Sequence, residues 1–306
     1  MKIYKSVFVG VCLFSLTACG SGSDPSGGTG TTGGATGGIV IPDALKESLT
    51  SATYNPAGAG TLVLNMAALD TTHNPAGYVR NAALDIGPYR AFTQQDDPLD
   101  RHFTALVAQV GSVRAGVVAD GGQFNRYYRG GFYERDGAFT PPTVSGLVSY
   151  AGTYAGVTNV GAPGADLLPI PIPVDSSREP RQSARIQGDI FLNVDFSDNV
   201  VNGNIINRTM VDYATALPNV VLIAAPIDEN GTFVGTTEYA DQTINGDYGG
   251  IFGGADAAAV GGVVALNSFD GPGDTLGFTE EEEHGTFVLI QCGMPGDAAI
   301  CPNVNP

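Results

Sequence analysis

Residues 246–266 read GDYGGIFGGADAAAVGGVVAL, and this stretch decides the fold. Its apolar runs indicate strands, yet it contains more glycines than two turns require. A glycine inside a strand allows the strand to bend or another group to approach its backbone closely. We therefore interpret the stretch as two antiparallel strands joined by the step GADAAA, with Gly249, Gly250, Gly261 and Gly262 allowing close packing at the wall of a coiled sheet.

The rest of the chain has the composition of an all-β protein. Its 306 residues include 43 glycines, and 43% of the residues are hydrophobic, so a core can form between many turns. In residues 143–306, short strands that follow one another predict an eight-stranded antiparallel up-and-down β-barrel, which has no free sheet edges. The predicted strands are 146–157, 188–197, 200–208, 220–227, 232–238, 246–254, 259–266 and 283–292.

Residues 39–142 predict a smaller β domain ahead of the barrel. Two apolar runs on either side of Gly111-Ser112 are typical of a β-hairpin. The two prolines within residues 139–144 oppose sheet pairing and mark the boundary between the two domains. Residues 158–184 are rich in proline and glycine, and we expect them to form a surface loop.

The first residues have the features of an export signal. A short basic start precedes an apolar run of twelve residues, which is too short to span a bilayer. The run ends in LTAC, residues 16–19, which resembles the bacterial lipobox. The resemblance implies removal of residues 1–18, lipidation of Cys19 and anchoring in the outer membrane, on its cell-surface or periplasmic face. An ordinary secretory signal is the alternative. Residues 19–38, rich in Gly, Ser and Thr, predict a flexible tether.

Charge and cysteine usage limit the possible partners. The net charge of −17 excludes general binding to nucleic acid, and anionic lipid surfaces would repel the chain as well. Cys12 would leave with the signal, so Cys292 and Cys301 remain in the exported chain. Two remaining cysteines in an exported protein predict a disulfide bond, and metal binding by two thiolates is the alternative.

No familiar catalytic motif occurs in the sequence, so we expect a protein that is not an enzyme and holds no metal. His73, His102 and His284 lie in separate segments without the spacing of metal ligands. The run EEEE, residues 280–283, is expected to be a solvated acidic turn, because consecutive strand residues point to opposite faces and do not converge on a cation.

Residues 123–135, QFNRYYRGGFYER, form the best candidate binding patch. We expect one aromatic strand, bent at a glycine pair, with Arg126 and Tyr128 on one face and Tyr127 and Arg129 on the other. An arginine beside a phenol is suited to a carboxylate or to a haem propionate. The alternative is that the arginines neutralise nearby acids and the aromatic rings pack the domain. The candidate residues are Arg126, Tyr127, Tyr128, Arg129 and Tyr133.

The opening stretch also resembles a known family signature. Transferrin-binding-protein-B-like lipoprotein barrels carry the pattern aromatic-x-Gly-Pro-x-Ala-Glu-Glu-Val-Gly-Gly. The proline of that pattern is replaced by Ala255 here, and the glutamate pair by Ala258-Ala259. The matching residues are Phe252, Gly254, Ala257, Val260, Gly261, Gly262 and Val263.

The resemblance implies a fold and a class of function. It implies a β handle-like domain, here residues 39–142, ahead of the barrel. It also implies a non-enzymatic surface lipoprotein that binds a ligand or a partner protein, in iron or haem acquisition. No partner-binding residue of the family can be placed on this sequence. A structural or adhesive envelope lipoprotein without a small-molecule ligand is the alternative.

Overall fold

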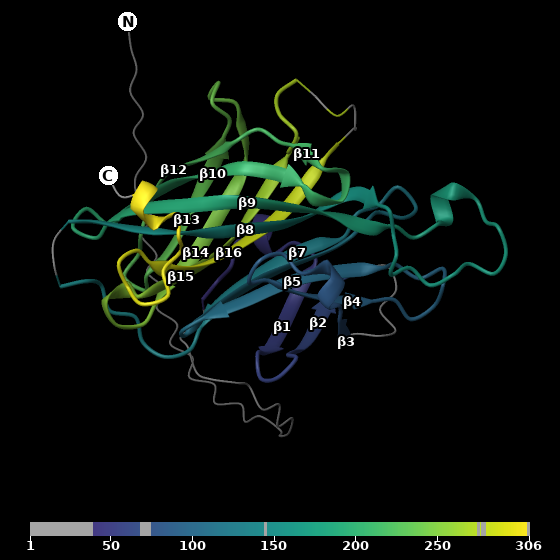
Figure 1. The fold of residues 1–306 in the computed structure, drawn as a ribbon, viewed down its shortest axis with the longest axis horizontal. Helices are drawn as coiled ribbons and strands as arrows, with labels where there is room; N and C mark the ends of the chain where they lie inside the picture. The colour runs from purple at the N-terminus through teal and green to yellow at the C-terminus, as the bar shows by residue number, and fades with distance from the viewer. Residues whose placement is uncertain (1–38, 68–74, 144–145, 274–275, 277–279, 305–306) are drawn as a thin grey trace, which may run out of the picture. The chain divides into compact units, whose positions relative to one another are not determined.

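The computed structural model describes residues 39–67, 75–143, 146–273, 276 and 280–304. The predicted signal, the Cys19 lipidation site and the tether lie outside these residues, and so does His73. Within the described ranges, no helix is both long enough and apolar enough to cross a membrane. The fold is all-β, as predicted, and consists of two antiparallel sheets (Figure 1).

The second sheet contains the predicted barrel. Eight of its strands pair in a ring, which closes where β9 pairs with β10, and this confirms the eight-stranded prediction. A short ninth strand, β11 (Thr215–Ala216), pairs with β10 at one end. The barrel strands are β8 (Leu147–Ala162), β9 (Gln182–Asp195), β10 (Val200–Met210), β12 (Val220–Pro226), β13 (Thr232–Glu238), β14 (Ile244–Gly253), β15 (Ala259–Asn267) and β16 (Glu282–Gln291).

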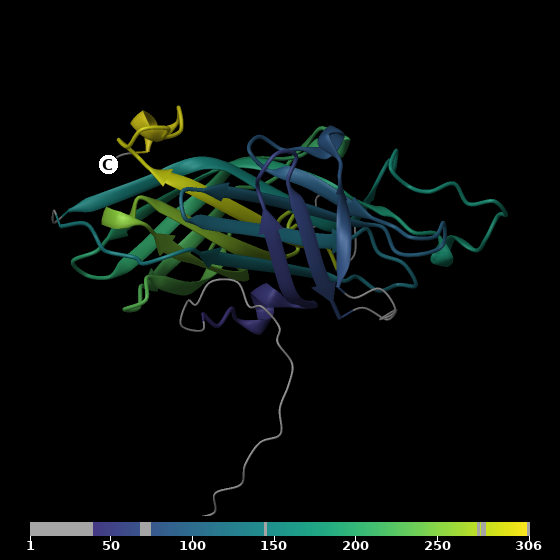
Figure 2. The same ribbon diagram turned by 90° about the horizontal axis from the view of Figure 1, so that it is seen from below.

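The first sheet is an antiparallel meander of seven strands that is nearly closed (Figure 2). Its strands β5 and β6 form the predicted hairpin, in which Gly111 takes the turn at a φ of 54°. The elements are α1 (Asp43–Lys46), β1 (Leu49–Asn55), β2 (Thr61–Met66), β3 (Ala76–Arg80), β4 (Arg90–Gln94), β5 (Phe103–Val110), β6 (Val113–Asp120) and β7 (Arg129–Arg135). Short 3₁₀ turns lie at η1 (Ala82–Leu84), η2 (Ser176–Arg178), η3 (Val211–Tyr213), η4 (Ala255–Ala257) and η5 (Cys301–Asn303).

The expected surface loop at 158–184 is shorter than the sequence predicted. β8 continues to Ala162 and β9 already begins at Gln182, so only residues 163–181 lie outside strands. Gly161 and Ala162 pair with Ser183 and Gln182, because small and uncharged residues fit the end of a strand as well as they fit a loop. The shortened loop is the teal segment that extends to the right in Figure 1.

The opening stretch forms β14 and β15, and its inward glycines make room inside the barrel. Gly250 pairs with Gly262 across the two strands. A Cβ atom added at Gly250 would lie 2.6 Å from the Phe233 ring, and one at Gly262 would overlap the Phe287 ring. These glycines therefore allow two large aromatic side chains to fill the barrel interior.

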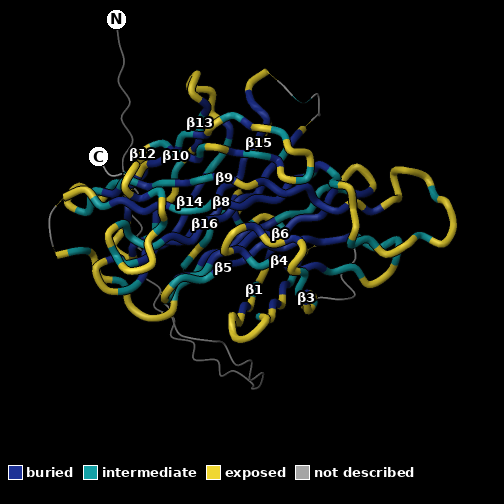
Figure 3. Tube along the Cα trace, viewed as in Figure 1, coloured by how far each residue is buried: buried dark blue, intermediate teal, exposed yellow. Residues whose placement is uncertain are grey.

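The outward glycines of the same strands admit the first sheet. A Cβ atom at Gly261 would lie 2.6 Å from Cγ1 of Val113, and one at Gly249 would lie 2.7 Å from Cδ1 of Leu45. Both faces of β15 are buried, one against the barrel core and one against the first sheet (Figure 3). This explains why residues 259–266 are apolar or glycine throughout and do not alternate with polar residues.

Hydrogen bonds from buried side chains also join the barrel to the first sheet and to the helix α1. The Tyr89 hydroxyl donates to the carbonyl oxygen of Thr153 at 2.7 Å and accepts from the backbone N–H of Val288 at 3.0 Å. The imidazole Nε2 of His284 lies 2.9 Å from the carbonyl oxygen of Leu45. Both sheets belong to one compact unit.

The buried imidazole of His284 is expected to make folding sensitive to acid. Burial lowers the pKa of His284 to about 3, although its hydrogen bond with the Leu45 carbonyl opposes that shift. In the unfolded chain the imidazole binds a proton below about pH 6.5. The unfolded state therefore binds more protons between about pH 6.5 and 3, and the free energy of unfolding falls as pH falls.

We expect the His284 contribution to lower the free energy of unfolding by about 2 kcal/mol between pH 7 and pH 5. Urea unfolding at both pH values checks this value. His284→Gln keeps a donor for the Leu45 carbonyl and removes the titration, so its loss over the same interval should be smaller. An equal loss in both proteins would contradict this role for His284.

Candidate functional site

A polar groove of about 710 Å³ lies beside the start of β7. The turn before β7 forms one side, the loop between β8 and β9 forms a second side, and the residues leading into β16 form the third. We call it the Arg126 groove. The lining residues that matter for its chemistry are Phe124, Arg126, Tyr127, Arg129, Arg181 and Glu282.

The turn before β7 corrects the prediction of one continuous strand over residues 123–135. β7 begins only at Arg129, and Gln123 and Arg126 exchange two backbone hydrogen bonds of 3.1 Å across a tight turn. Phe124 and Asn125 occupy the turn with φ values of 55° and 53°. The assignment of residues 126–129 to alternating strand faces was therefore wrong. Strand periodicity did not reveal a turn built from residues other than glycine.

Phe124 holds an unusual position in this turn. A bulky residue with positive φ is strained by about 1–3 kcal/mol, and such strain persists only where surrounding contacts enforce it. The backbone N–H of Phe124 donates to the carbonyl oxygen of Ser177 at 2.7 Å, which fixes the turn to the neighbouring loop. The side chain remains 50% exposed in the groove. An aromatic ring is thus presented to solvent at a fixed place.

A buried ion pair fixes the backbone of the turn through hydrogen bonds. Arg101 pairs with Asp120, and it donates to the carbonyl oxygens of Arg126 at 3.0 Å and Gln123 at 2.8 Å. Asp120 also accepts the backbone N–H of Tyr128 at 3.0 Å. These bonds hold the backbone of the turn in one arrangement, so the groove wall is formed before any ligand binds.

The five candidate residues do not form one site. Arg126, Tyr127 and Arg129 line the groove. Tyr128 lies under Arg101, whose guanidinium carbon is 4.6 Å from the centre of the ring. Tyr133 is only 2% exposed and packs in the core between the two sheets. Tyr128 and Tyr133 therefore fit the packing alternative that the sequence left open.

The arginines of the groove differ in their partners. Arg129 pairs with Glu282 and, at 3.1 Å, with Glu47, so its charge is neutralised within the fold. In the part of the chain that the structure describes, the guanidinium groups of Arg126 and Arg181 have no ion pair. Because acidic residues also line the groove, its charge is mixed and not uniformly positive.

Tyr127 lines the groove, but its hydroxyl points away from the groove surface and is buried. This hydroxyl has no hydrogen-bond partner among the residues described. Burial is the main reason why the pKa of Tyr127 is raised, so the phenol remains neutral and can donate a hydrogen bond. The Arg129 guanidinium carbon lies 5.4 Å from the centre of its ring. Tyr127 therefore packs against the core between the two sheets, and its buried hydroxyl is not presented to a ligand in the groove.

The acidic run 280–283 is not the solvated turn that the sequence predicted. Glu282 pairs with Arg129, and Glu283 is fully buried inside the barrel. The Glu283 carboxylate accepts hydrogen bonds from the Arg208 guanidinium and, at 2.5 Å, from the Tyr154 hydroxyl. Three different strands supply this network, and Arg208 turns inward only because the pairing of β9 and β10 shifts between Ile206 and Thr209. Neither the convergence of three strands on Glu283 nor the inward orientation of Arg208 can be predicted from local sequence.

Among the described residues, no group of three or more His, Cys, Asp and Glu side chains is placed to hold a metal ion. His102 instead contacts Asp166 at 2.9 Å, which ties the β8–β9 loop to the first sheet. Hydrogen bonds from Thr93, His102 and Asn81 overcome the effect of burial and hold the pKa of Asp166 below its usual value.

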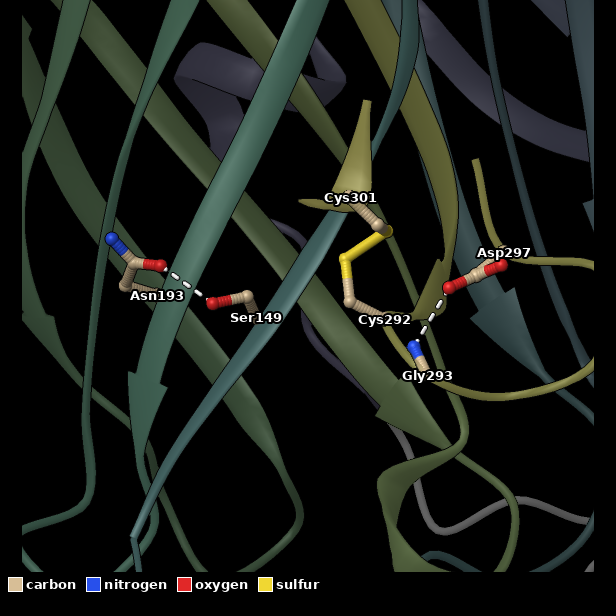
Figure 4. The surroundings of a disulfide bond; sticks show 6 residues. All are labelled: Ser149, Asn193, Cys292, Gly293, Asp297 and Cys301. Atoms are coloured by element: carbon tan, nitrogen blue, oxygen red, sulfur yellow. Dashed lines mark hydrogen bonds between the residues drawn. A yellow bond between two sulfur atoms is a disulfide. The ribbon is translucent and has the colours of Figure 1, made fainter. Parts of the chain in front are cut away.

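Cys292 and Cys301 form a disulfide bond after the last barrel strand (Figure 4). Their Cα atoms are 5.4 Å apart. The backbone N–H of Cys292 donates to the carbonyl oxygen of Ser149 at 2.8 Å, which fixes this end of the chain to β8. The enclosed loop is also held by a 2.7 Å hydrogen bond from the Gly293 backbone N–H to Asp297. The two cysteines therefore fix the end of the chain beside the last barrel strand, as the disulfide prediction expected.

No protein-family model matches the chain, and no curated protein matches it. Solved structures of transferrin-binding protein B do resemble it. A double mutant from Haemophilus parasuis Hp5 is 15% identical with a TM-score of 0.40, over 75% of this chain and 40% of that one. Intact Ap-TbpB is 14% identical with a TM-score of 0.39, over 75% and 41%. The serogroup B Neisseria meningitidis isotype 1 protein is 13% identical with a TM-score of 0.34, over 75% and 37%.

The chain thus spans about two fifths of the length of these structures. The likeness concerns the fold, and at these identities and TM-scores it assigns no binding partner to this chain.

Proposed function

We propose that this protein is a non-enzymatic lipoprotein of the outer membrane or cell surface, and that it binds a partner protein through the Arg126 groove. Membrane attachment is supported by the LTAC tetrapeptide at residues 16–19 and by the tether after it. The observation that carries the binding proposal is the groove itself. It combines the strained, half-exposed Phe124 with the guanidinium groups of Arg126 and Arg181, which form no ion pair with any residue that the structure describes.

These side chains are suited to a protein partner. Aromatic and arginine side chains contribute most of the affinity in protein interfaces, and a preformed wall reduces the entropy lost on binding. The mixed charge of the groove fits a partner segment that carries both an acceptor group and a cation. More specifically, we propose a role in iron acquisition, in which the protein captures its partner and passes the iron on to a transporter.

Haem fits the groove less well than a protein does. The arginines could hold propionates, but the described lining residues include no His, Met or Cys, and the Tyr127 hydroxyl is buried. A haem titration distinguishes the two ligands. A Soret shift that Arg126→Ala combined with Arg181→Ala abolishes would assign haem to the groove, whereas the absence of a shift would favour the protein partner.

Photo-crosslinking in the native cells tests the proposal. A photo-reactive amino acid in place of Phe124 should give a discrete adduct with one envelope protein. Arg126→Ala combined with Arg181→Ala should reduce that adduct by at least about tenfold. Arg178→Ala is the matched control, since Arg178 is an exposed arginine of the same loop that does not line the groove, and it should leave the adduct unchanged.

The same photo-reactive group in place of Val234, which is 44% exposed on β13, controls for random contact. Equal adducts from both positions, or none from Phe124, would rule out the groove as the binding site. Altered envelope integrity or attachment on deletion of the protein, without an adduct, would favour the structural or adhesive alternative.

A further inference from the structure

The first sheet contains an odd number of strands, and this prevents it from closing as the second sheet does. Each of its seven strands is antiparallel to the next, so β1 and β7 run in the same direction. The second sheet has eight strands in its ring, so its antiparallel pattern continues around the closure. One further strand between β1 and β7 would be antiparallel to both of them.

β1 and β7 meet only at their first residues. The backbone N–H of Ser48 donates to the carbonyl oxygen of Arg129 at 2.9 Å. A Cβ atom added at Gly130 would lie 2.5 Å from Cβ of Leu49, so this glycine permits the contact. Among the residues described, no strand pairing joins β1 to β7 beyond that point.

A groove of about 370 Å³ opens where the two edges separate, and we call it the β1–β7 gap. Four consecutive residues of β1, Leu49 to Ala52, line one side, and four of β7, Gly131 to Glu134, line the other. Ile39, Ile41 and Lys46, from the segment before β1, complete the lining without pairing to either edge. Leu49 and Phe132 are both buried in the core of the first sheet, so the floor of the gap is apolar. The gap is therefore an apolar opening between two sheet edges.

The backbone and the charges of the gap define what it can hold. On an edge strand of an antiparallel sheet, alternate residues direct their N–H and C=O groups away from the ladder and can pair with an added strand. β1, LTSATYN, has neither the charges nor the proline that usually protect a sheet edge. The two charged lining residues are already engaged, Lys46 with Asp43 at 3.4 Å and Glu134 with Arg114. An uncharged, extended segment matches these features.

We propose that the β1–β7 gap binds an extended, uncharged segment of another protein, which adds as an eighth strand antiparallel to both β1 and β7. Main-chain hydrogen bonds would hold about four residues, and alternate apolar side chains would cover Leu49 and Phe132. Residues 20–38 of this chain, which directly precede the described part, are mostly Gly, Ser and Thr and offer few apolar side chains for that floor. The site is separate from the Arg126 groove and does not depend on the function proposed for it.

Hydrogen exchange of the full-length chain tests this inference, with an acetylated and amidated hexapeptide of alternating threonine and valine as the probe. Without peptide, the edge amides of β1 and β7 should exchange fast. Saturating peptide should slow them by at least about tenfold. The same peptide with N-methylated amides keeps its side chains and loses its donors, so it should have no effect.

Two lysine variants distinguish edge pairing from unspecific adsorption. Ser51 and Thr53 are exposed on the same face of β1, but only Ser51 lines the gap. Ser51→Lys should weaken the affinity for the peptide by at least about tenfold, and Thr53→Lys should leave it nearly unchanged. Equal effects of the two variants would overturn the inference, and so would slow edge exchange in the free chain or indifference to the peptide. Faster edge exchange after deletion of residues 20–38 would also overturn it, because the chain's own segment would then fill the gap.

Discussion

Arg208→Met is expected to lower the free energy of unfolding by about 3–5 kcal/mol, because it leaves the buried Glu283 carboxylate without its cation. Both side chains are fully buried. Burial disfavours the charged guanidinium, but the Glu283 charge holds the pKa of Arg208 above its usual value. The Arg208 guanidinium also donates to the carbonyl oxygens of Pro218 at 2.6 Å and Phe269 at 3.1 Å. The single change therefore removes the partners of three groups in the barrel.

Urea unfolding monitored by tyrosine fluorescence measures this loss. Adding Glu283→Leu to Arg208→Met should restore part of the stability, because the unpaired charge is then gone. Lys46→Ala removes a cation from the exposed pair of Lys46 with Asp43 and should change stability by less than about 1 kcal/mol. A double variant less stable than Arg208→Met alone would show that packing, and not the unpaired charge, dominates.

Gly262→Val is expected to lower the free energy of unfolding by about 3 kcal/mol or more, at the upper end of what overpacking does. The added atoms would overlap the carbonyl oxygen of Gly249 on β14 and the ring of Phe287. The carbonyl belongs to a paired strand and cannot move without breaking the sheet. Thermal unfolding followed by circular dichroism measures the loss.

Gly77→Val is the matched control for this prediction. Gly77 also lies within a strand, β3, but a Cβ atom added there meets no other atom within 4 Å. Since valine favours strands where there is room, the control should be neutral or slightly stabilising. Equal melting temperatures for Gly262→Val and the unaltered protein would refute the close-packing role of the glycine.

The sequence identified the barrel because strand and turn patterns are local. Every predicted barrel strand overlaps an observed one, and the hairpin at Gly111 was found from its turn residues. Errors arose where the same local sequence pattern is compatible with two different backbone structures. The sequence predicted a loop at Gly161 and Ala162, but these residues extend β8. It predicted a strand from Gln123 to Tyr128, but these residues form a turn and the segment that leads into β7.

The candidate site was predicted only in part for the same reason. Composition indicated the patch around Arg126, but it could not separate Arg126 from Arg129, whose partners Glu47 and Glu282 lie far away along the chain. Arg181, from the loop before β9, was missed altogether. Its place in the groove depends on the backbone contact between its carbonyl oxygen and the N–H of Gly121 at 3.0 Å.

The stretch GDYGGIFGGADAAAVGGVVAL by itself predicted two adjoining strands that pack closely at the wall of a coiled sheet, since only glycine leaves such room at a strand position. The stretch did not determine which side chains lie against these glycines. The tertiary structure places Phe233 and Phe287 inside and Val113 and Leu45 outside. These neighbours come from distant parts of the chain, and only the closure of the barrel and the packing of the first sheet against its wall bring them together.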